Sequence, residues 1–155
     1  MKSLIICVSI HHQNTEKIAE IIAENLPAEI KKPDTVRSED LASYNIIGFG
    51  SGIYRWKHHK DLLNFVDNMT EMEKKPVFIF STSRFANGIK FHKKLRNKLL
   101  ERNCNIIGEF NCPGYYSAGP IKIIGGVNKN RPNENDYEKA RIFTQTLIEK
   151  LNINN

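Results

Sequence analysis

The chain has 155 residues, of which 40% are hydrophobic and 26% charged, and this composition fits one globular domain over residues 1–155. Its three cysteines are odd in number and widely spaced, which excludes a disulfide or zinc framework. No apolar run approaches the ~20 residues that cross a bilayer, and the amino terminus has no signal-peptide pattern, so we expect a cytoplasmic protein without a membrane partner. The net charge of +6 favours acidic partners over basic ones.

The chain opens with a strand, a polar loop and a helix. An apolar run predicts the strand over residues 2–8, and apolar residues at helical spacing predict a helix from Asn14 to Leu26. The loop Ser9–Thr15 therefore lies at the end of the first strand, where free amides and the positive end of the helix dipole suit a phosphate. Asn14 or Thr15 is equally suited to be the N-cap of that helix, and both interpretations stay open at this point.

Strands and helices then alternate to the end of the chain. The predicted strands cover residues 2–8, 28–32, 45–50, 77–80 and 106–110. Three further helices carry apolar stripes at Leu62, Phe65, Val66 and Met69, at Phe91, Leu95, Leu99 and Leu100, and at Ala140, Phe143, Leu147, Ile148 and Leu151. Asn133 is a suitable N-cap for the last of these helices.

This alternation predicts an α/β domain with five parallel strands and helices on both faces of the sheet. Such sheets bind ligands at the carboxyl ends of the strands. The loops that leave those ends are Ser9–Thr15, Ser51–Trp56, Ser81–Phe85 and Asn111–Gly119, and they are rich in aromatic residues and glycines. A planar aromatic ligand with a phosphate tail fits that set. The segment 111–131 is longer than most loops, and we expect it to be ordered and functional.

Several other functions are disfavoured by what the sequence lacks. Adjacent histidines rarely bind one metal ion together, and no acid or cysteine completes a ligand set, so we expect no metal site. There is no Gly-x-Ser-x-Gly, Gly-x-Gly-x-x-Gly or Walker sequence. Basic residues gather at Lys57–Lys60 and between Lys90 and Arg102, either as a solvated helix face or as a docking surface for an acidic partner. Nucleic acid is not expected, because no recognisable nucleic-acid module is present.

At these positions the sequence resembles the flavodoxins. Their phosphate loop is similar to Ser/Thr-x-Thr-Gly-Asn-Thr; the loop Ser9–Thr15 keeps the final Asn-Thr but is one residue longer and has Gln13 where glycine is usual. It matches better a branch of flavodoxin-like proteins whose loop reads Ser-x-His-His-x-Asn-Thr. That branch also resembles the chain at Tyr44–Tyr54, at Gly108–Cys112 and from Gly125 to Asn133.

The resemblance implies a three-layer sandwich with strand order 2-1-3-4-5 and one FMN per chain, bound without a covalent link. The phosphate would be bound by the first loop, and the flavin ring would lie between the second and third loops, with Tyr54 or Trp56 against it. No catalytic residue is expected. The expected FMN-binding residues are Ser9, His11, His12, Gln13, Asn14, Thr15, Ser51, Gly52, Ile53, Tyr54, Trp56, Thr82, Ser83, Phe85 and Tyr115.

Three functions are compatible with this fold. The first is a non-enzymatic electron carrier, which the short chain favours because little of it is left for a substrate pocket. Its partners would be acidic redox proteins, such as a ferredoxin-like protein or a reductase, and it would be a monomer or weak dimer. The alternative is an FMN-dependent NAD(P)H or quinone oxidoreductase, with segment 111–131 as a substrate cover. A flavin-free domain, such as a receiver or a scaffold, is the third. A receiver needs a carboxylate cluster at the strand ends, and the first three loops hold no acids.

Overall fold

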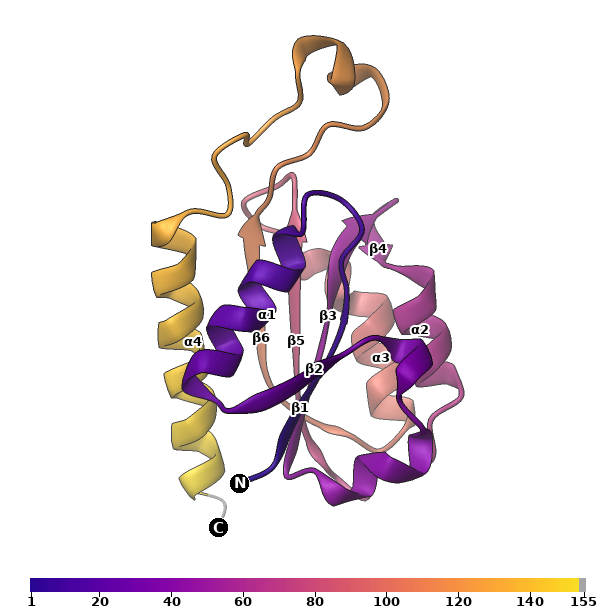
Figure 1. The fold of residues 1–155 in the computed structure, drawn as a ribbon. Helices are drawn as coiled ribbons and strands as arrows, with labels where there is room; N and C mark the ends of the chain where they lie inside the picture. The colour runs from indigo at the N-terminus through magenta and orange to yellow at the C-terminus, as the bar shows by residue number, and fades with distance from the viewer. Residues whose placement is uncertain (154–155) are drawn as a thin grey trace.

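A computed structural model describes residues 1–153 of the chain and contains one central sheet. Its strands follow the order β2-β1-β3-β5-β6 and are all parallel, while β4 pairs with β3 in the antiparallel sense (Figure 1). The strands are β1 (Ser3–Val8), β2 (Ala28–Lys31), β3 (Ile46–Tyr54), β4 (Lys57–His58), β5 (Pro76–Ser83) and β6 (Asn105–Pro113). The predicted parallel α/β sandwich and its strand order are confirmed, and β4 is an addition to them.

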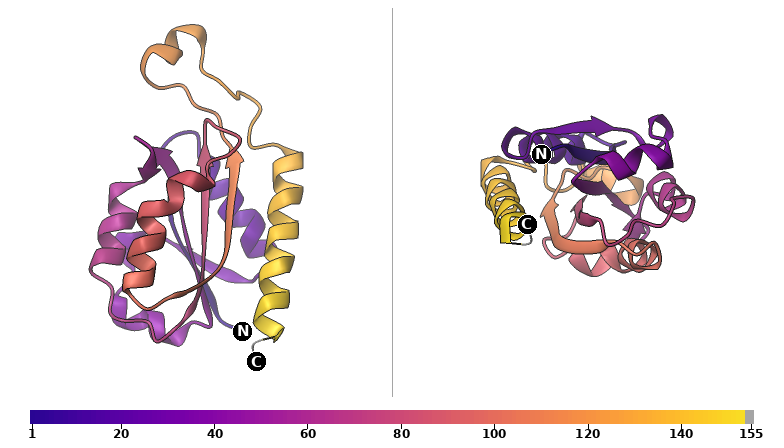
Figure 2. Two further views of the ribbon diagram at one scale, coloured as in Figure 1. Left: turned by 180° about the vertical axis from the view of Figure 1, so that it is seen from behind. Right: turned by 90° about the horizontal axis from the view of Figure 1, so that it is seen from below.

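Helices cover both faces of the sheet, two on each (Figures 1 and 2). On one face lie α1 (Asn14–Asn25) and α4 (Glu134–Ile153), and on the other lie α2 (Lys60–Asp67) and α3 (Lys93–Glu101). Four short 3-10 helices complete the set: η1 (Pro33–Thr35), η2 (Ser38–Ser43), η3 (Ile89–His92) and η4 (Gly119–Ile124). Within residues 1–153, no helix is both long enough and apolar enough to span a membrane.

Each central strand contributes side chains to two hydrophobic cores, because successive side chains of a strand point to opposite faces of the sheet. In β1, Leu4 and Ile6 pack in the core beneath α2 and α3, whereas Ile5 and Cys7 pack in the core beneath α1 and α4. The strand therefore has no polar face, which explains why it reads as a continuous apolar run. Burial of Cys7 raises the pKa of its thiol to about 12, so this cysteine is an inert core residue.

Two glycines of β3 make room for aromatic rings. A Cβ atom on Gly48 would lie 2.3 Å from the ring of Phe78, and one on Gly50 would lie 2.1 Å from the ring of Phe80. Both phenylalanines belong to β5, the neighbouring strand, and both are fully buried. The two rings thus cover the backbone of β3 directly, and a larger residue in place of either glycine would overlap with them.

β3, β5 and β6 are longer than the sequence predicted, and two expected loops are largely strand. β3 continues through Ser51 to Tyr54 and then turns into β4, and β5 continues to Ser83. The reason is backbone pairing: Ser51 lies opposite Ser81 in the parallel ladder, and the small polar side chains do not interrupt it. Because the prediction relied on polarity, it ended both strands several residues before their true ends.

Two predictions about single residues are wrong for similar reasons. Cys112 falls in the segment expected to be a loop, Asn111–Gly119, but it lies in β6 and is buried, and this burial raises the pKa of its thiol above the usual range. Leu100 was expected on the buried stripe of its helix, but its side chain is 54% exposed. By contrast, Asn133 caps α4 as predicted, since its side-chain oxygen accepts a hydrogen bond from the amide of Asn135.

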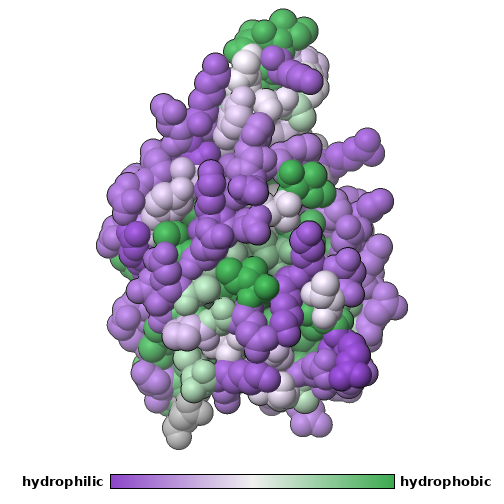
Figure 3. Space-filling view, in the orientation of Figure 1, coloured by the Kyte–Doolittle hydropathy of each residue, from purple (hydrophilic) through white to green (hydrophobic). Residues whose placement is uncertain are grey.

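The segment between β6 and α4 rises beyond the carboxyl edge of the sheet (Figure 1). An antiparallel bridge between Tyr116 and Val127 joins its two limbs, and η4 forms its far end. Ile123 and Ile124 are 89% and 73% exposed there, and the top of the molecule in Figure 3 is correspondingly hydrophobic. The expected long ordered loop is therefore present, with a hydrogen-bonded base and an apolar tip.

Replacing Gly50 by alanine should lower the free energy of unfolding by about 1–3 kcal/mol, because the new Cβ overlaps with the ring of Phe80. Urea unfolding measures this loss. Phe80→Leu removes the ring atoms concerned, so the double variant should be more stable than the sum of the two single losses predicts. Strictly additive losses would show that the contact does not limit this position.

Candidate functional site

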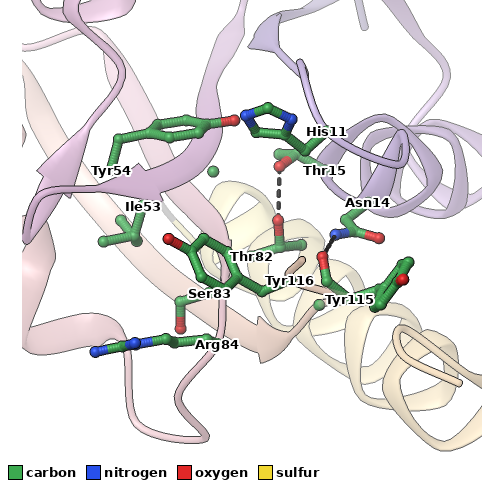
Figure 4. A pocket seen from close by; sticks show the side chains of 12 residues that line it. His11, Asn14, Thr15, Ile53, Tyr54, Thr82, Ser83, Arg84, Tyr115 and Tyr116 are labelled. Carbon is green, nitrogen blue, oxygen red and sulfur yellow. Dashed lines mark hydrogen bonds between the residues drawn. The ribbon is translucent and has the colours of Figure 1, made fainter. Parts of the chain in front are cut away.

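A cleft of about 350 Å³ opens at the carboxyl ends of β1, β3, β5 and β6. Its walls come from segments that are far apart in the sequence and meet at this edge of the sheet, as the fold class predicts. The lining residues are His11, Asn14, Thr15, Gly52, Ile53, Tyr54, Thr82, Ser83, Arg84, Gly114, Tyr115 and Tyr116. Figure 4 shows their side chains converging from α1, the ends of β3 and β5, and the segment after β6.

The loop before α1 presents unpaired backbone amides. His12 and Gln13 have φ angles of 56° and 54°, in the left-handed region, and Gln13 is the N-cap of α1. Within the described residues the amides of His11, His12 and Gln13 donate no hydrogen bond. Ser9 closes the loop, because its hydroxyl oxygen accepts from the amide of Glu16 at 3.3 Å. Free amides at the positive end of a helix form a site for an anion.

Neither Asn14 nor Thr15 caps the helix, although the sequence allowed that interpretation. The side chain of Asn14 donates to the carbonyl oxygen of Tyr115 at 2.8 Å, and the hydroxyl of Thr15 lies 2.8 Å from that of Thr82 (Figure 4). Both side chains are buried. They thus tie the start of α1 to β5 and to the segment after β6, and they fix the loop amides relative to the rest of the cleft.

Aromatic rings form the sides of the cleft. The ring of His12 lies 4.0 Å from that of Tyr115 between centroids, and its Nε2 atom is 2.8 Å from the hydroxyl of Ser117. His11 and Tyr54 face each other across the opposite side, with centroids 6.0 Å apart. Burial raises the pKa of Tyr54, so its hydroxyl stays protonated and can donate.

A second hollow of about 580 Å³ adjoins the cleft and shares four of its residues. It adds Trp56 and Phe85, whose rings stack with centroids 5.4 Å apart and an interplanar angle of 16°. No carboxylate of residues 1–153 lines either hollow, while Arg55 and Arg84 line the second. An anionic ligand is therefore favoured over a cationic one.

Of the fifteen side chains predicted for the site, the structure brings eleven to the two hollows. They are His11, Asn14, Thr15, Gly52, Ile53, Tyr54, Trp56, Thr82, Ser83, Phe85 and Tyr115. Ser9, His12 and Gln13 belong to the amide loop beside the cleft without lining it. Ser51 faces away, because its hydroxyl bonds to Gly52, His58 and His59 behind the sheet edge.

Three residues that line the cleft are missing from the FMN-binding set expected from the sequence. Arg84 follows β5 directly, and its guanidinium lies 4.5 Å from the centre of the Phe85 ring. Gly114 lies so close to Asn14 that a Cβ atom would be 2.8 Å from its side-chain nitrogen. Tyr116 completes the wall. All three lie close to the carboxyl end of a predicted strand, and this position was the only feature of the sequence that pointed to the cleft.

A buried polar cluster lies behind the cleft, between the sheet and α3. His58 and His92 are 1% and 0% exposed, and their rings lie 4.9 Å apart. His58 Nδ1 is 2.9 Å from the hydroxyl of Ser51, and His92 Nε2 is 2.7 Å from that of Ser81. The two serines are neighbours in the ladder between β3 and β5, so the ends of these strands position both imidazoles.

Hydrogen bonds hold both ring nitrogens of His92. Nε2 lies 2.7 Å from the hydroxyl of Ser81, and that hydroxyl donates to the side-chain oxygen of Asn111 at 3.0 Å. Nδ1 lies 2.8 Å from the carboxylate of Glu109. The ring is thus fixed between β5 and β6.

The pKa values of Glu109 and His58 are both lowered, which keeps the carboxylate charged and the imidazole neutral. Burial would raise the pKa of Glu109, but hydrogen bonds from His92 and Arg96 outweigh it and lower the pKa to about 2. Burial, and then the charge of His92, hold the pKa of His58 well below its usual value of 6.5. The cluster thus places the neutral imidazole of His58 against the ring of His92, which bonds to the Glu109 carboxylate.

Comparison with known proteins identifies relatives. A family model described as a flavodoxin domain matches residues 5–114. An uncharacterized protein of Methanocaldococcus jannaschii is 48% identical over 149 residues, covering 96% of this chain and 99% of that protein. An archaeal flavodoxin superposes with a TM-score of 0.72 at 14% identity, covering 98% of this chain and 99% of its own. Oxidised flavodoxin 2 from Bacillus cereus gives 0.72 at 20% identity, with 97% and 99% covered. At these identities the two structures show a shared fold.

The neutral state of His58 makes stability depend on pH. Below pH 6.5 the unfolded chain protonates this residue while the folded chain does not, so stability is complete above that pH and falls by up to about 1.4 kcal/mol per pH unit beneath it. His58→Asn should flatten the slope between about pH 6.5 and 5 in urea unfolding. His11→Asn, on the exposed loop, serves as control; an unchanged slope in His58→Asn would refute the assignment.

Proposed function

The chain belongs to the flavodoxin family, and from this premise we propose that it binds one FMN non-covalently and carries electrons between redox proteins. One observation supports this most directly. The unpaired amides at the start of α1 adjoin, at one end of the sheet, a cleft with aromatic walls. A phosphate site beside a slot for a flat ring matches the two ends of FMN.

The residues present fit such a ligand in charge and in the kinds of group they offer. The cleft and the hollow beside it present hydroxyl groups and aromatic rings next to the free amides of the loop before α1. The dianionic phosphate would meet the amides of His11, His12 and Gln13 and the positive end of α1, with no carboxylate lining the cleft. A protonated His11 would add a charge-assisted hydrogen bond.

The remaining side chains would hold the rest of the cofactor. The hydroxyls of Thr15, Thr82 and Ser83 lie where a ribityl chain or ring edge requires polar contacts, and Tyr54, Tyr116 and the Trp56–Phe85 stack would exclude water from the ring. When bound, FMN supplies the capacity to exchange one or two electrons. The side chains would bind and orient the cofactor and give it a positively charged environment that excludes water.

A carrier is favoured over an enzyme by the charge of the chain. The net charge of +6 favours acidic redox partners, such as a ferredoxin-like protein or a reductase. We expect the chain to act as a monomer or weak dimer, since each copy holds a complete cleft.

Purified protein mixed with FMN should show flavin absorbance bands after removal of free cofactor. In anaerobic titration with dithionite, absorbance should change in two successive one-electron stages, as a carrier requires. A single two-electron stage would instead favour the oxidoreductase alternative, and NADH, NADPH and quinones would be tested next. Failure to take up any flavin would refute the proposal.

Asn14→Ala combined with Thr15→Ala should weaken FMN binding at least about tenfold, which is about 1.4 kcal/mol, because the amide loop loses both of its ties. Fluorescence titration measures the affinity, and circular dichroism checks the fold. Asn25→Ala with Thr35→Ala makes the same two replacements at exposed positions away from the cleft and should leave affinity unchanged. If the two double variants bound FMN with equal affinity, the assignment of the phosphate to the loop before α1 would be refuted.

A further inference from the structure

Unpaired cations gather beside the open end of the cleft. We define the cationic face as the exposed side chains of Arg55, Lys57, Lys60, Arg84, Lys90, Lys93 and Lys94. They come from the β3–β4 hairpin, the loop after β5, η3 and the first residues of α2 and α3, which lie together in the view from behind (Figure 2, left). Within residues 1–153 none of the seven forms an ion pair with a carboxylate.

The sequence leaves acids out of this face. No Asp or Glu occurs between Phe49 and Lys60, or between Pro76 and Leu100. Elsewhere in the structure some cations pair with carboxylates, as where Arg131 meets Asp136 and Arg141 meets Glu134. The two acid-free stretches carry only positive charge, which reinforces the positive ends of α2 and α3 that point to the same edge.

The positions of these cations oppose helix stability. The first turn of a helix favours acidic residues, yet α3 begins with Lys93 and Lys94 and has no acid in its first turn. Lys60 begins α2 as well, although the first turn of that helix also holds Asp61. Cations at the start of α3 repel the helix dipole, so local stability does not account for Lys93 and Lys94. A requirement for positive charge at the surface does.

The β3–β4 turn carries a similar conflict. Its two central residues, Arg55 and Trp56, have φ angles of 47° and 66°, a geometry in which hairpins favour Asn-Gly. Both side chains are nevertheless large and exposed, and Trp56 is 60% accessible. One face of its ring stacks on Phe85, which in turn lies beneath the guanidinium of Arg84. An apolar centre thus stands within the ring of cations.

We propose that the cationic face is the docking surface for an acidic protein, with Trp56 and Phe85 at its centre. Aromatic and arginine side chains at the centre and charges around them are the usual composition of a protein interface. The field of the unpaired cations would steer an acidic partner to this end of the molecule. That the partner is a redox protein rests on the proposed function, because the same aromatic pair lines the hollow beside the cleft.

A protein fits this surface better than nucleic acid does. Single strands bind through successive bases, each stacked on a separately exposed ring. Here the rings of Trp56, Phe85 and Phe91 pack on one another, with centroids 5.3–5.7 Å apart, and they offer no row of free faces. Their contact surface is a single apolar patch.

The test measures binding of an acidic plant-type [2Fe–2S] ferredoxin by calorimetry, with FMN-free and FMN-loaded protein. Binding should weaken at least about tenfold between about 0.01 M and 0.15 M salt, as the Debye length falls from about 30 Å to about 8 Å. At low salt Lys90→Glu with Lys93→Glu should weaken it at least about fivefold. Glutamate at the start of α3 favours that helix, so the variant should fold.

Lys74→Glu with Lys139→Glu is the matched control, since it changes the net charge equally at exposed positions remote from the face. It should weaken binding less than about twofold. Equal losses in the two variants would reduce the effect to net charge and overturn the proposal, as would the absence of ferredoxin binding. Tighter binding of single-stranded poly(U), abolished by Lys90→Glu with Lys93→Glu, would assign the face to nucleic acid instead. Ferredoxin binding without FMN uptake would refute the carrier function while leaving the docking surface.

Discussion

The constraint on which the structure depends is the common direction of its strands. Because β1, β3, β5 and β6 run parallel, their carboxyl ends meet at one edge, and helices that follow three of them begin there. Backbone dipoles therefore make this edge positive before any side chain is considered. The chain adds to that field: no carboxylate of the described residues lines the cleft, and arginines and lysines stand around it. The loop amides at α1 and the cationic face both follow from this arrangement.

The fold was predictable from the sequence because its signals are local. Apolar runs and helical spacings alternate along the chain, and a parallel sheet covered on both faces is the simple solution. The extent of the strands was not predictable, because Ser51 and Ser81 look like loop residues and are held in the ladder by their neighbours' backbones. Which way a side chain faces at such a position depends on that register.

Within the site, the sequence located the loops that form the cleft but not the contacts that their side chains make. The Asn-Thr pair before α1 was recognised, but its contacts with Tyr115 and Thr82 span more than sixty residues and leave no local pattern. Arg84 was missed because a single arginine after a strand carries no motif. The buried pair of His58 and His92 was also missed, since its hydrogen-bond partners come from three separate strands, and histidines considered singly suggest surface or metal sites.

The paired hydroxyls of Thr15 and Thr82 have a consequence for how the cleft can respond to its ligand. Only one of their two protons lies between the oxygens, 2.8 Å apart, and either threonine can supply it. The other proton is then left on α1 or on β5, according to which hydroxyl donates. Rotation of the two hydroxyl hydrogens thus exchanges a donor and an acceptor position in the wall of the cleft. The cleft can therefore match a ligand whose hydrogen-bonding pattern changes with its oxidation state, without any movement of the backbone.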